Sequence, residues 1–281
     1  MRQDQPRRLF CDLSPTAYRI SAWKCRTLRH LKNACMLGRL AREKQAPLPE
    51  VIYRHSALIR RRLGNVSSEL QENKAVNLAL AAPKISGIVI RPGQTFSFWT
   101  LVGACTRKKG YLEGLVFRNG ETGQAVGGGM CQFTNLIHWM VLHTPLEICE
   151  HHHHDSADFF PDYGRQVPFG TGTSIAYNYL DYRFRNPTDR VYQLIVWVDG
   201  EYLRGEIRSD RPQPEKYHIR TENECFTCED GVWYRCGEVW REQIDRRTGQ
   251  VVGRTCIRRN HARVYYDPAL IPPEKRQTPD A

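Results

Sequence analysis

The sequence predicts an α+β fold, in which a helical N-terminal region packs on a mostly antiparallel β-sheet and one central helix begins at a glycine-rich motif that contains Cys131. Three observations support this class. Helical periodicity dominates the first 83 residues, and short β-rich runs separated by glycine follow from Ile85. One amphipathic stripe after Gly129 interrupts those runs.

Composition excludes several classes of protein. The chain has 281 residues, 41% hydrophobic and 25% charged, so it is not collagenous, coiled-coil or wholly disordered. The uncharged stretch from Thr122 to Leu146 holds glycines, amides and histidines that would have no partners in lipid, so it is not a transmembrane segment. The first eight residues carry no apolar run that would indicate a secretory signal. We therefore expect a cytoplasmic protein, with peripheral association at a membrane as a further expectation.

Three helices are expected in the N-terminal region. They cover residues 15–45, residues 51–63 with a stop at Gly64-Asn65, and a stretch that Ser67-Ser68 caps and that runs to Pro83. The first 72 residues hold 15 Lys and Arg against 6 Asp and Glu, which is a net charge of +9 out of +11. This charge fits a solvated basic face or contact with an anionic surface such as phospholipid. No nucleic-acid-binding motif accompanies it, so no nucleic acid partner is expected.

The second part of the chain is predicted to be mostly β. Expected strands lie at 88–90, 95–99, 114–117, 175–179, 182–184, 191–198 and 202–207, with Asp199-Gly200 as a hairpin turn. Arg211-Pro-Gln-Pro indicates a linker to a small β-rich part with a polar tail. The predicted organisation is a basic helical region (1–47), a main domain (48–210) and a cysteine-containing β-rich region (211–281).

The segment Gly127-Gly-Gly-Met-Cys131 carries the strongest indication of chemistry. Cys131 lies at the start of the amphipathic helix, where free N–H groups and the helix dipole favour a thiolate over a thiol. Gly128 and Gly129 allow a substrate to approach closely, and the backbone N–H groups from Gly129 to Gln132 are candidates for an oxyanion hole. These are the requirements of a cysteine nucleophile. The alternative is a small buried residue after a glycine turn.

The run Glu150-His-His-His-His154 supplies candidate bases. His138 is seven residues from Cys131 along the helix, about 10.5 Å, which is too far for a hydrogen bond to the thiol. In an extended segment, His152 and His154 share one face and His151 and His153 the other, so one pair can face Cys131. A solvated polar loop and a metal site are the alternatives. An orienting carboxylate or amide would complete the arrangement, and the candidates are Asp155, Asp158, Asp162, Asp181 and Asn178.

Dense Gly and Pro residues between Phe159 and Thr173 predict loops that shape a substrate groove. Arg165 either holds a substrate carboxylate or closes a surface ion pair. Aromatic residues around Tyr177, together with Asn178, are candidates to line the groove and contact the substrate.

The ten cysteines are expected to be mostly reduced thiols. Cys225, Cys228, Cys236 and Cys256 have a spacing that a Cys₄ zinc site could use, but the second Cys-x₂-Cys pair is missing. The expectation is therefore unpaired, partly buried thiols, with no metal and no other cofactor.

Residues 48–208 resemble the VanW family, which is associated with vancomycin resistance. The motifs that carry the resemblance are Arg91-Pro-Gly-Gln-Thr-Phe-Ser-Phe98, Lys109-Gly-Tyr111, Gly127-Gly-Gly-Met-Cys-Gln132, Glu150-His-His-His-His154, Phe160-Pro-Asp162, Pro168-Phe-Gly170 and Tyr177-Asn-Tyr-Leu-Asp181. Some larger members are associated with L,D-transpeptidase activity, in which a cysteine cross-links peptidoglycan stem peptides. Carried over, the resemblance implies Cys131 as the nucleophile and His152 and His154 as the matching histidines.

Two functions are expected from the residues and the resemblance together. As an enzyme, the protein would form a thioester between Cys131 and a peptidoglycan stem peptide or precursor, with His154 or His152 as base, and release it to an amine or to water. As an accessory protein, the same groove would hold a cell-wall precursor or a partner of the resistance system without turnover. The accessibility and reactivity of the Cys131 thiol separate the two.

Overall fold

The structure is a computed structural model that describes residues 10–61, 67–118, 121–153, 157–162 and 166–277. The main helices are α1 (Pro15–Cys35), α2 (Ser68–Ile85), α3 (Phe98–Val102) and α4 (Met130–Val141). The strands are β1 (Glu50–Leu58), β2 (Ile88–Ile90), β3 (Thr95–Ser97), β4 (Glu113–Arg118), β5 (Glu121–Val126), β6 (Glu147–Glu150), β7 (Ala157–Asp158), β8 (Arg183–Arg185), β9 (Tyr192–Asp199), β10 (Tyr202–Ser209), β11 (Glu215–Glu229), β12 (Val232–Asp245), β13 (Val251–Val264) and β14 (Arg276–Gln277). The predicted α+β class is confirmed.

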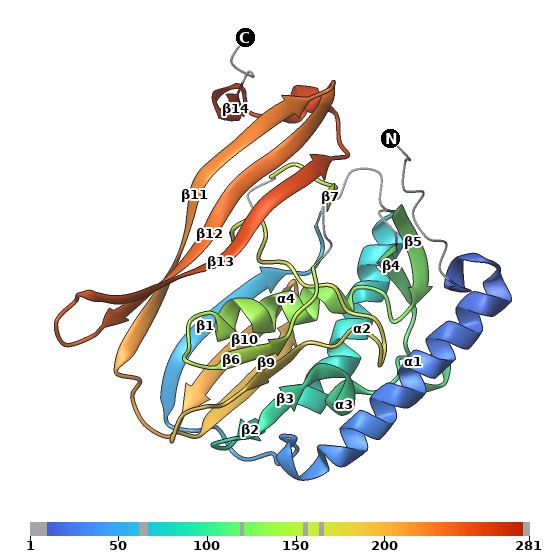
Figure 1. The fold of residues 1–281 in the computed structure, drawn as a ribbon. Helices are drawn as coiled ribbons and strands as arrows, with labels where there is room; N and C mark the ends of the chain where they lie inside the picture. The colour runs from blue at the N-terminus through green and yellow to red at the C-terminus, as the bar shows by residue number, and fades with distance from the viewer. Residues whose placement is uncertain (1–9, 62–66, 119–120, 154–156, 163–165, 278–281) are drawn as a thin grey trace.

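The central sheet has the strand order β1-β10-β9-β2, and its neighbouring strands are antiparallel. Helix α4 contacts β1 and β10, and α2 contacts β9, so both helices cover one face of this sheet (Figure 1). The hairpin β4-β5 leads directly into α4. The sheet and α2 therefore form the rigid base on which the helix that begins at the glycine-rich motif is placed.

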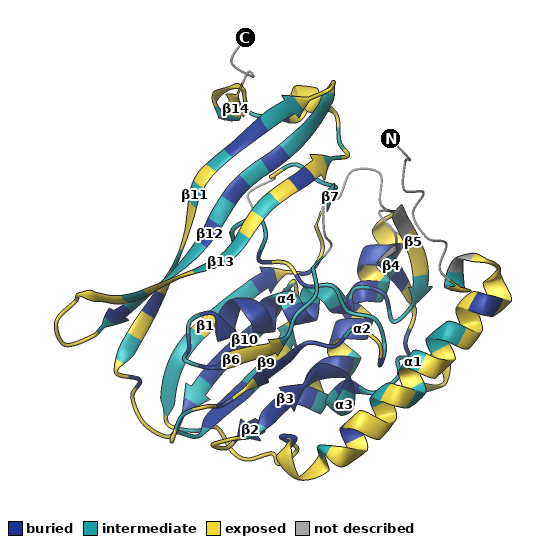
Figure 2. Cartoon of the chain, viewed as in Figure 1, coloured by how far each residue is buried: buried dark blue, intermediate teal, exposed yellow. Residues whose placement is uncertain are grey.

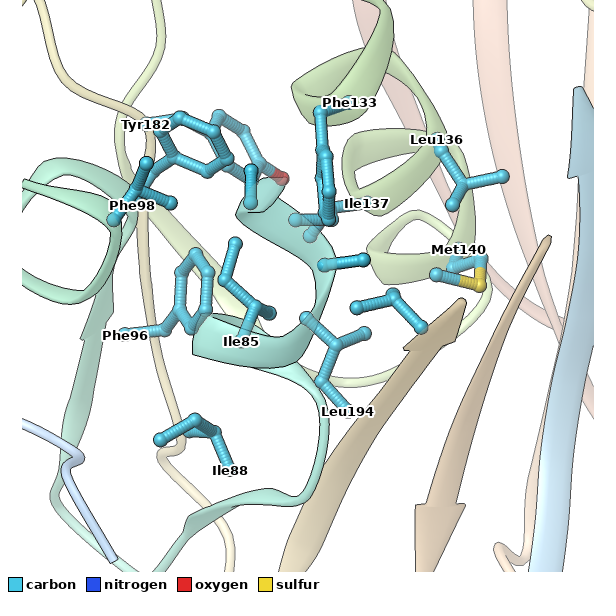
Figure 3. Close-up of a cluster of buried hydrophobic side chains, with 14 of the residues drawn as sticks. Ile85, Ile88, Phe96, Phe98, Phe133, Leu136, Ile137, Met140, Tyr182 and Leu194 are labelled. Atoms are coloured by element: carbon cyan, nitrogen blue, oxygen red, sulfur yellow. The ribbon is translucent and has the colours of Figure 1, made fainter. Parts of the chain in front are cut away.

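The core lies between α4, α2 and the central sheet. Phe133, Ile137 and Met140 are fully buried on one side of α4, as the amphipathic stripe predicts (Figure 3). Gly205 in β10 permits this close packing, because a Cβ there would lie 2.6 Å from the Met140 Cε atom. Burial of several large side chains along α4 fixes its position and hence that of Cys131 at its first turn.

The expected helix over residues 51–63 is wrong, because Glu50–Leu58 forms strand β1. Val51, Ile52 and Tyr53 are β-branched or aromatic residues that favour a strand, and β1 pairs along its length with β10. The spacing of apolar residues is compatible with a helix or a strand, and pairing with the distant strand β10 makes this segment a strand.

Other expected boundaries also differ. Helix α1 ends at Cys35 instead of residue 45, α2 continues through Pro83 to Ile85, and Trp99 lies in α3 instead of a strand. The expected strand at 175–179 is a turn, closed by the Leu180 N–H donating to the Ala176 carbonyl at 3.0 Å. Asn178 in this turn has a φ of 47°, which a strand does not allow.

The C-terminal part is β-rich, as predicted, and its long strands β11, β12 and β13 form a sheet with β14 and β7 (Figure 1). Strand β7 belongs to the loop before the Phe160-Pro-Asp162 motif, so this sheet is joined to the main domain. Arg235 in β12 strengthens the junction: it is 2% exposed and forms ion pairs with Asp158 (3.3 Å), Asp162 and Glu224. The C-terminal sheet is thereby fixed against the loop that borders Cys131.

Candidate functional site

Cys131 is the second residue of α4, and the preceding Gly129 caps the helix with a φ of 94°. The three glycines are held by their own amides: Gly127, Gly128 and Gly129 donate to the carbonyls of Leu112 (2.9 Å), Ala125 (3.0 Å) and Leu115 (3.1 Å). These three N–H groups are therefore occupied by hydrogen bonds within the protein and are not free to bind an oxyanion. The amides of Met130 and Cys131, which have no acceptor within the helix, are the oxyanion-hole candidates in their place.

Gln132 also differs from its expected role. Its amide N–H donates to the Gly129 carbonyl at 3.0 Å, and its side-chain Nε2 donates to the Leu58 carbonyl at 2.8 Å. Gln132 thus joins α4 to the end of β1 while its side chain remains on the wall of a pocket beside Cys131.

Gly128 lies against the backbone of β4. A Cβ at Gly128 would come within 2.2 Å of the Gly114 carbonyl carbon and oxygen, which are backbone atoms that cannot move aside. The buried Asn77 in α2 donates to the Gly128 carbonyl at 3.0 Å and accepts from the Leu112 N–H at 2.8 Å. The requirement for glycine here is close approach of two backbones.

Substitution Gly128→Ala is expected to lower the free energy of unfolding by about 3 kcal/mol, because β4 must move away from the first turn of α4. Gly123→Ala is the matched control in the same hairpin, since its Cβ would meet only Val116 Cγ2 at an ordinary 3.8 Å. Urea unfolding measures both variants. Equal stability of Gly128→Ala and wild type would contradict the close backbone approach.

The Cys131 thiol is protonated at rest. Burial raises its pKa, although backbone hydrogen bonds with Ile175 and with Cys131 itself act in the opposite direction. The expectation that the helix N-terminus would produce a thiolate is wrong, because desolvation of the charge outweighs the local donors. A nucleophilic Cys131 therefore needs a base that removes its proton during the attack.

The histidine that shares pockets with Cys131 is His153, which differs from the expected His152 and His154. His153 borders the same two pockets as Cys131. His152 turns toward Glu150, with 3.1 Å between Nε2 and Oε1, and His154 lies outside the described residues. The alternation of side chains along the run was predicted, and the structure places His153 at the Cys131 pockets.

Three imidazole rings lead from the core to the pockets. The ring centroids of His138 and His151 are 4.1 Å apart and those of His151 and His153 are 3.9 Å apart. His138 shares a hydrogen bond of 3.1 Å with the Tyr182 hydroxyl, and the His151 Nε2 atom lies 3.1 Å from the Gly172 carbonyl. Burial lowers the pKa of His138 well below its usual value and that of His151 to about 3, so both rings are neutral near pH 7.

Cys131 lies where two pockets meet. One has a volume of about 310 Å³ and the other about 720 Å³, and Cys131, His153 and Phe159 border both. The smaller pocket is also lined by Phe169 and by residues of the C-terminal strand β13. The larger one extends toward Trp99 and Tyr177. Ligands in either pocket would therefore lie against Cys131.

Lys74 is a site residue that sequence reasoning missed. It lines the smaller pocket, is 7% exposed, and its Cγ atom fills the space where a Gly129 Cβ would lie. Burial lowers its pKa to about 7, with the charges of Arg61 and Arg60 acting in the same direction. The signal in the sequence was a lysine four residues after Leu70 and four before Leu78, at the helical spacing of the buried side of α2.

The titration of Lys74 makes stability depend on pH. Between about pH 7 and 10 the side chain is neutral in the folded chain and protonated in the unfolded chain, so the unfolded state binds more protons and the free energy of unfolding rises with pH. Lys74→Met is expected to reduce this slope by about 1.4 kcal/mol per pH unit. Urea unfolding of both proteins across this range measures the difference, and identical slopes would contradict a depressed pKa.

Asp181 and Asn178 have structural contacts in place of the expected orienting role. Asp181 is buried and accepts hydrogen bonds from Ser97 Oγ (2.6 Å), the Trp99 N–H (3.0 Å) and Arg183 Nε (2.7 Å). Asn178 donates to the Arg26 carbonyl at 3.1 Å. The contacts of Asp181 hold α3, and the contact of Asn178 holds α1, against the segment that contains both residues.

Tyr177 is on the wall of the larger pocket, as expected for a substrate-contacting aromatic residue. Its ring packs edge-on against Trp99 with 5.5 Å between centroids. Arg165 lies outside the described residues.

The four C-terminal cysteines do not form one cluster. Cys225 and Cys236 are opposite each other on β11 and β12, whereas Cys228 and Cys256 are opposite Trp233 and Trp240. Within the described ranges, the group with metal-ligand spacing consists of Glu229, Cys236 and His261. Glu229 and His261 are exposed and already paired at 2.9 Å.

Comparisons with known proteins identify the family of the chain. Residues 73–208 match the family model described as VanW like protein. The chain is 35% identical over 196 residues to the vancomycin B-type resistance protein VanW of Enterococcus faecalis, covering 70% of this chain and 71% of the relative. It is 31% identical over 115 residues to the uncharacterized protein YoaR of Bacillus subtilis, covering 41% of this chain and 36% of that protein. No solved structure matches the chain.

The region that matches the family model contains most of α2, the glycine-rich motif, Cys131 and the histidine run. The chain belongs to the VanW family.

Proposed function

We propose that this protein is a vancomycin-resistance-associated protein of cell-wall metabolism and that it is a Cys131-dependent acyl-transfer enzyme acting on peptidoglycan stem peptides. The name of the Enterococcus relative supports the association with resistance. The observation that carries the enzymatic part is the position of Cys131, with His153, at the junction of two pockets. A transferase that works through a covalent intermediate needs room for an acyl donor and an acceptor on either side of its nucleophile.

In the first step, the Cys131 sulfur attacks the carbonyl carbon of the donor peptide while His153 takes the thiol proton. The amides of Met130 and Cys131 stabilise the oxyanion. The C–N bond then breaks, the leaving amine takes the proton from His153, and a thioester remains on Cys131. In the second step an acceptor amine attacks the thioester, His153 takes the proton of that amine, and it returns a proton to the departing sulfur.

The protonated state of Cys131 assigns His153 a definite role. A preformed thiolate would need no base in the first step, but a thiol whose pKa burial raises does. The two histidines behind His153 are compatible with this role. His138 and His151 are neutral, so they add no positive charge that would oppose protonation of His153.

His153→Ala is expected to lower the rate of acyl transfer by about 10²- to 10⁴-fold, the contribution of a general base. His152→Ala is the matched control, because the His152 ring faces Glu150 and not the pockets. Its rate should stay close to that of wild type. Initial rates with a synthetic stem tetrapeptide and an amine acceptor measure both variants. A loss confined to His152→Ala would contradict the assignment of the base.

Two-substrate kinetics test the proposed function itself. With donor peptide and acceptor amine varied independently, a ping-pong pattern of parallel double-reciprocal lines is expected, because the donor's leaving group departs before the acceptor reacts. Intersecting lines would indicate that both substrates must be bound before reaction and would contradict the thioester route.

A second candidate function is that of an accessory protein that binds a cell-wall precursor without turnover. The raised pKa of Cys131 and the engagement of the three glycine amides by the protein's own carbonyls favour it. Calorimetric titration with the stem tetrapeptide separates the two candidates. A binder holds the peptide unchanged, with equal affinity in wild type and Cys131→Ala, whereas an enzyme converts it only in wild type.

A further inference from the structure

Helix α1 is attached to the body of the protein mainly by polar contacts. Arg29 forms a two-point ion pair with Glu150 (2.5 and 2.7 Å), and Asn33 accepts a hydrogen bond from Arg183 at 2.5 Å. Of the described residues of α1, Ala17 and Asn33 are buried. The helix is thus firmly placed although it contributes little apolar surface to the core.

The large apolar side chains of α1 face outward. Ile20, Trp23, Leu28 and Leu31 follow one another at intervals of 3, 5 and 3 residues, which puts them on one side of the helix. Trp23 is 68% exposed and Leu31 60% exposed, and Figure 2 shows most of the outer surface of α1 as exposed. A helix that packs on a soluble core has the opposite arrangement, with its apolar side inside.

The segment that contains α1 is strongly basic. Between Leu13 and Arg42 the chain has seven Lys and Arg residues and no Asp or Glu. Lys24 and Lys32 on α1 have long side chains that can reach a lipid headgroup while the apolar residues insert between headgroups. Trp is the residue type that prefers this boundary between water and hydrocarbon.

We propose that the outward face of α1, made by Ile20, Trp23, Leu28 and Leu31 with the surrounding basic residues, binds the surface of an anionic phospholipid bilayer. Charge complementarity selects this occupant: Arg29 is paired with Glu150, but an uncharged partner surface would not account for the exposed Lys24 and Lys32 beside the apolar face in a segment that has no Asp or Glu. Within the described residues, no helix combines the length and apolarity needed to cross a bilayer, so the helix lies in the plane of the interface.

The opposite face of α1 forms part of the wall of the larger pocket. Tyr18, Ala22, Cys25 and Arg26 line the larger of the two pockets beside Cys131. One helix therefore separates that pocket from the proposed bilayer surface. Resting on the proposed function, this geometry deepens it: the substrate class is a stem peptide carried on a lipid anchor, whose peptide enters the larger pocket while the anchor stays in the membrane.

Vesicle flotation without any substrate tests the contact independently of catalysis. The full chain is expected to float with phosphatidylcholine vesicles that contain phosphatidylglycerol, and much less with phosphatidylcholine alone. The double variant Trp23→Ser/Leu31→Ser is expected to reduce the bound fraction at least about tenfold. Val252→Ser/Leu270→Ser, which removes exposed apolar side chains elsewhere, is the control and should bind like wild type.

Three further measurements separate the outcomes. Cys131→Ala should float like wild type, so a failure of the acyl-transfer proposal leaves this test intact. Reaction of a soluble peptide without vesicles should be unchanged in the Trp23→Ser/Leu31→Ser variant, because its side chains face away from the pocket. Absence of flotation, equal flotation of that variant, or a dimer of wild type that the variant loses in sedimentation analysis would each overturn the proposal.

Discussion

Replacing Cys131 by alanine is expected to lower the rate of acyl transfer by about 10³-fold or more, because the reaction loses its nucleophile and not a supporting contact. The fold should persist, since the exchange removes only one sulfur atom and costs about 1 kcal/mol. Initial rates with stem tetrapeptide and acceptor amine, together with a thermal unfolding curve, measure both effects.

Cys149→Ala is the matched control for this variant. Cys149 is an exposed cysteine in β6, and it borders neither of the two pockets beside Cys131. Its removal should leave the rate unchanged. A Cys131→Ala protein with the rate of wild type would exclude the cysteine as nucleophile.

Arg235→Met is expected to lower the free energy of unfolding by about 3–5 kcal/mol, which corresponds to roughly 10 °C in melting temperature. Arg235 faces Asp158, Asp162 and Glu224, and its guanidinium lies 4.5 Å above the Phe169 ring. Without it, the 1%-exposed Asp158 and its neighbour Asp162 lose their shared cation, whereas Glu224 keeps its ion pair with Lys275 at 2.6 Å. Activity should fall as well, because Asp158 and Phe169 line the smaller pocket.

Arg220→Met serves as the control for Arg235. Arg220 lies in the neighbouring strand β11 and pairs with Glu242 at 2.7 Å, but its side chain is 58% exposed. Exposed ion pairs contribute about 0–1 kcal/mol, so the control should unfold close to wild type. Similar losses in the two variants would contradict a central role for the buried cluster around Arg235.

The fold class and the position of Cys131 could be predicted because their signals are local. The stripe from Phe133 to Val141 has helical spacing within a few residues, and the glycines before it end the preceding hairpin. Strand β1 could not be predicted, because its pairing with β10 joins residues about 150 positions apart. Apolar spacing alone left helix and strand open there.

The site was predicted in part. Alternation along the histidine run divides the rings into two sets, but the side that faces Cys131 depends on Glu150, which draws His152 away. Burial is the largest cause of both the depressed pKa of Lys74 and the raised pKa of Cys131. Neither burial is encoded in the residues immediately around the group, so tertiary packing decided both protonation states.

Intact-mass spectrometry of wild type and Cys131→Ala after incubation with synthetic stem tetrapeptide, with and without acceptor amine, tests the central claim most directly. We expect a mass increase equal to the acyl part of the donor in wild type alone, and its loss to the acceptor when the amine is added. An adduct of equal mass on Cys131→Ala, or no adduct on folded wild type while the donor is consumed, would contradict a thioester on Cys131.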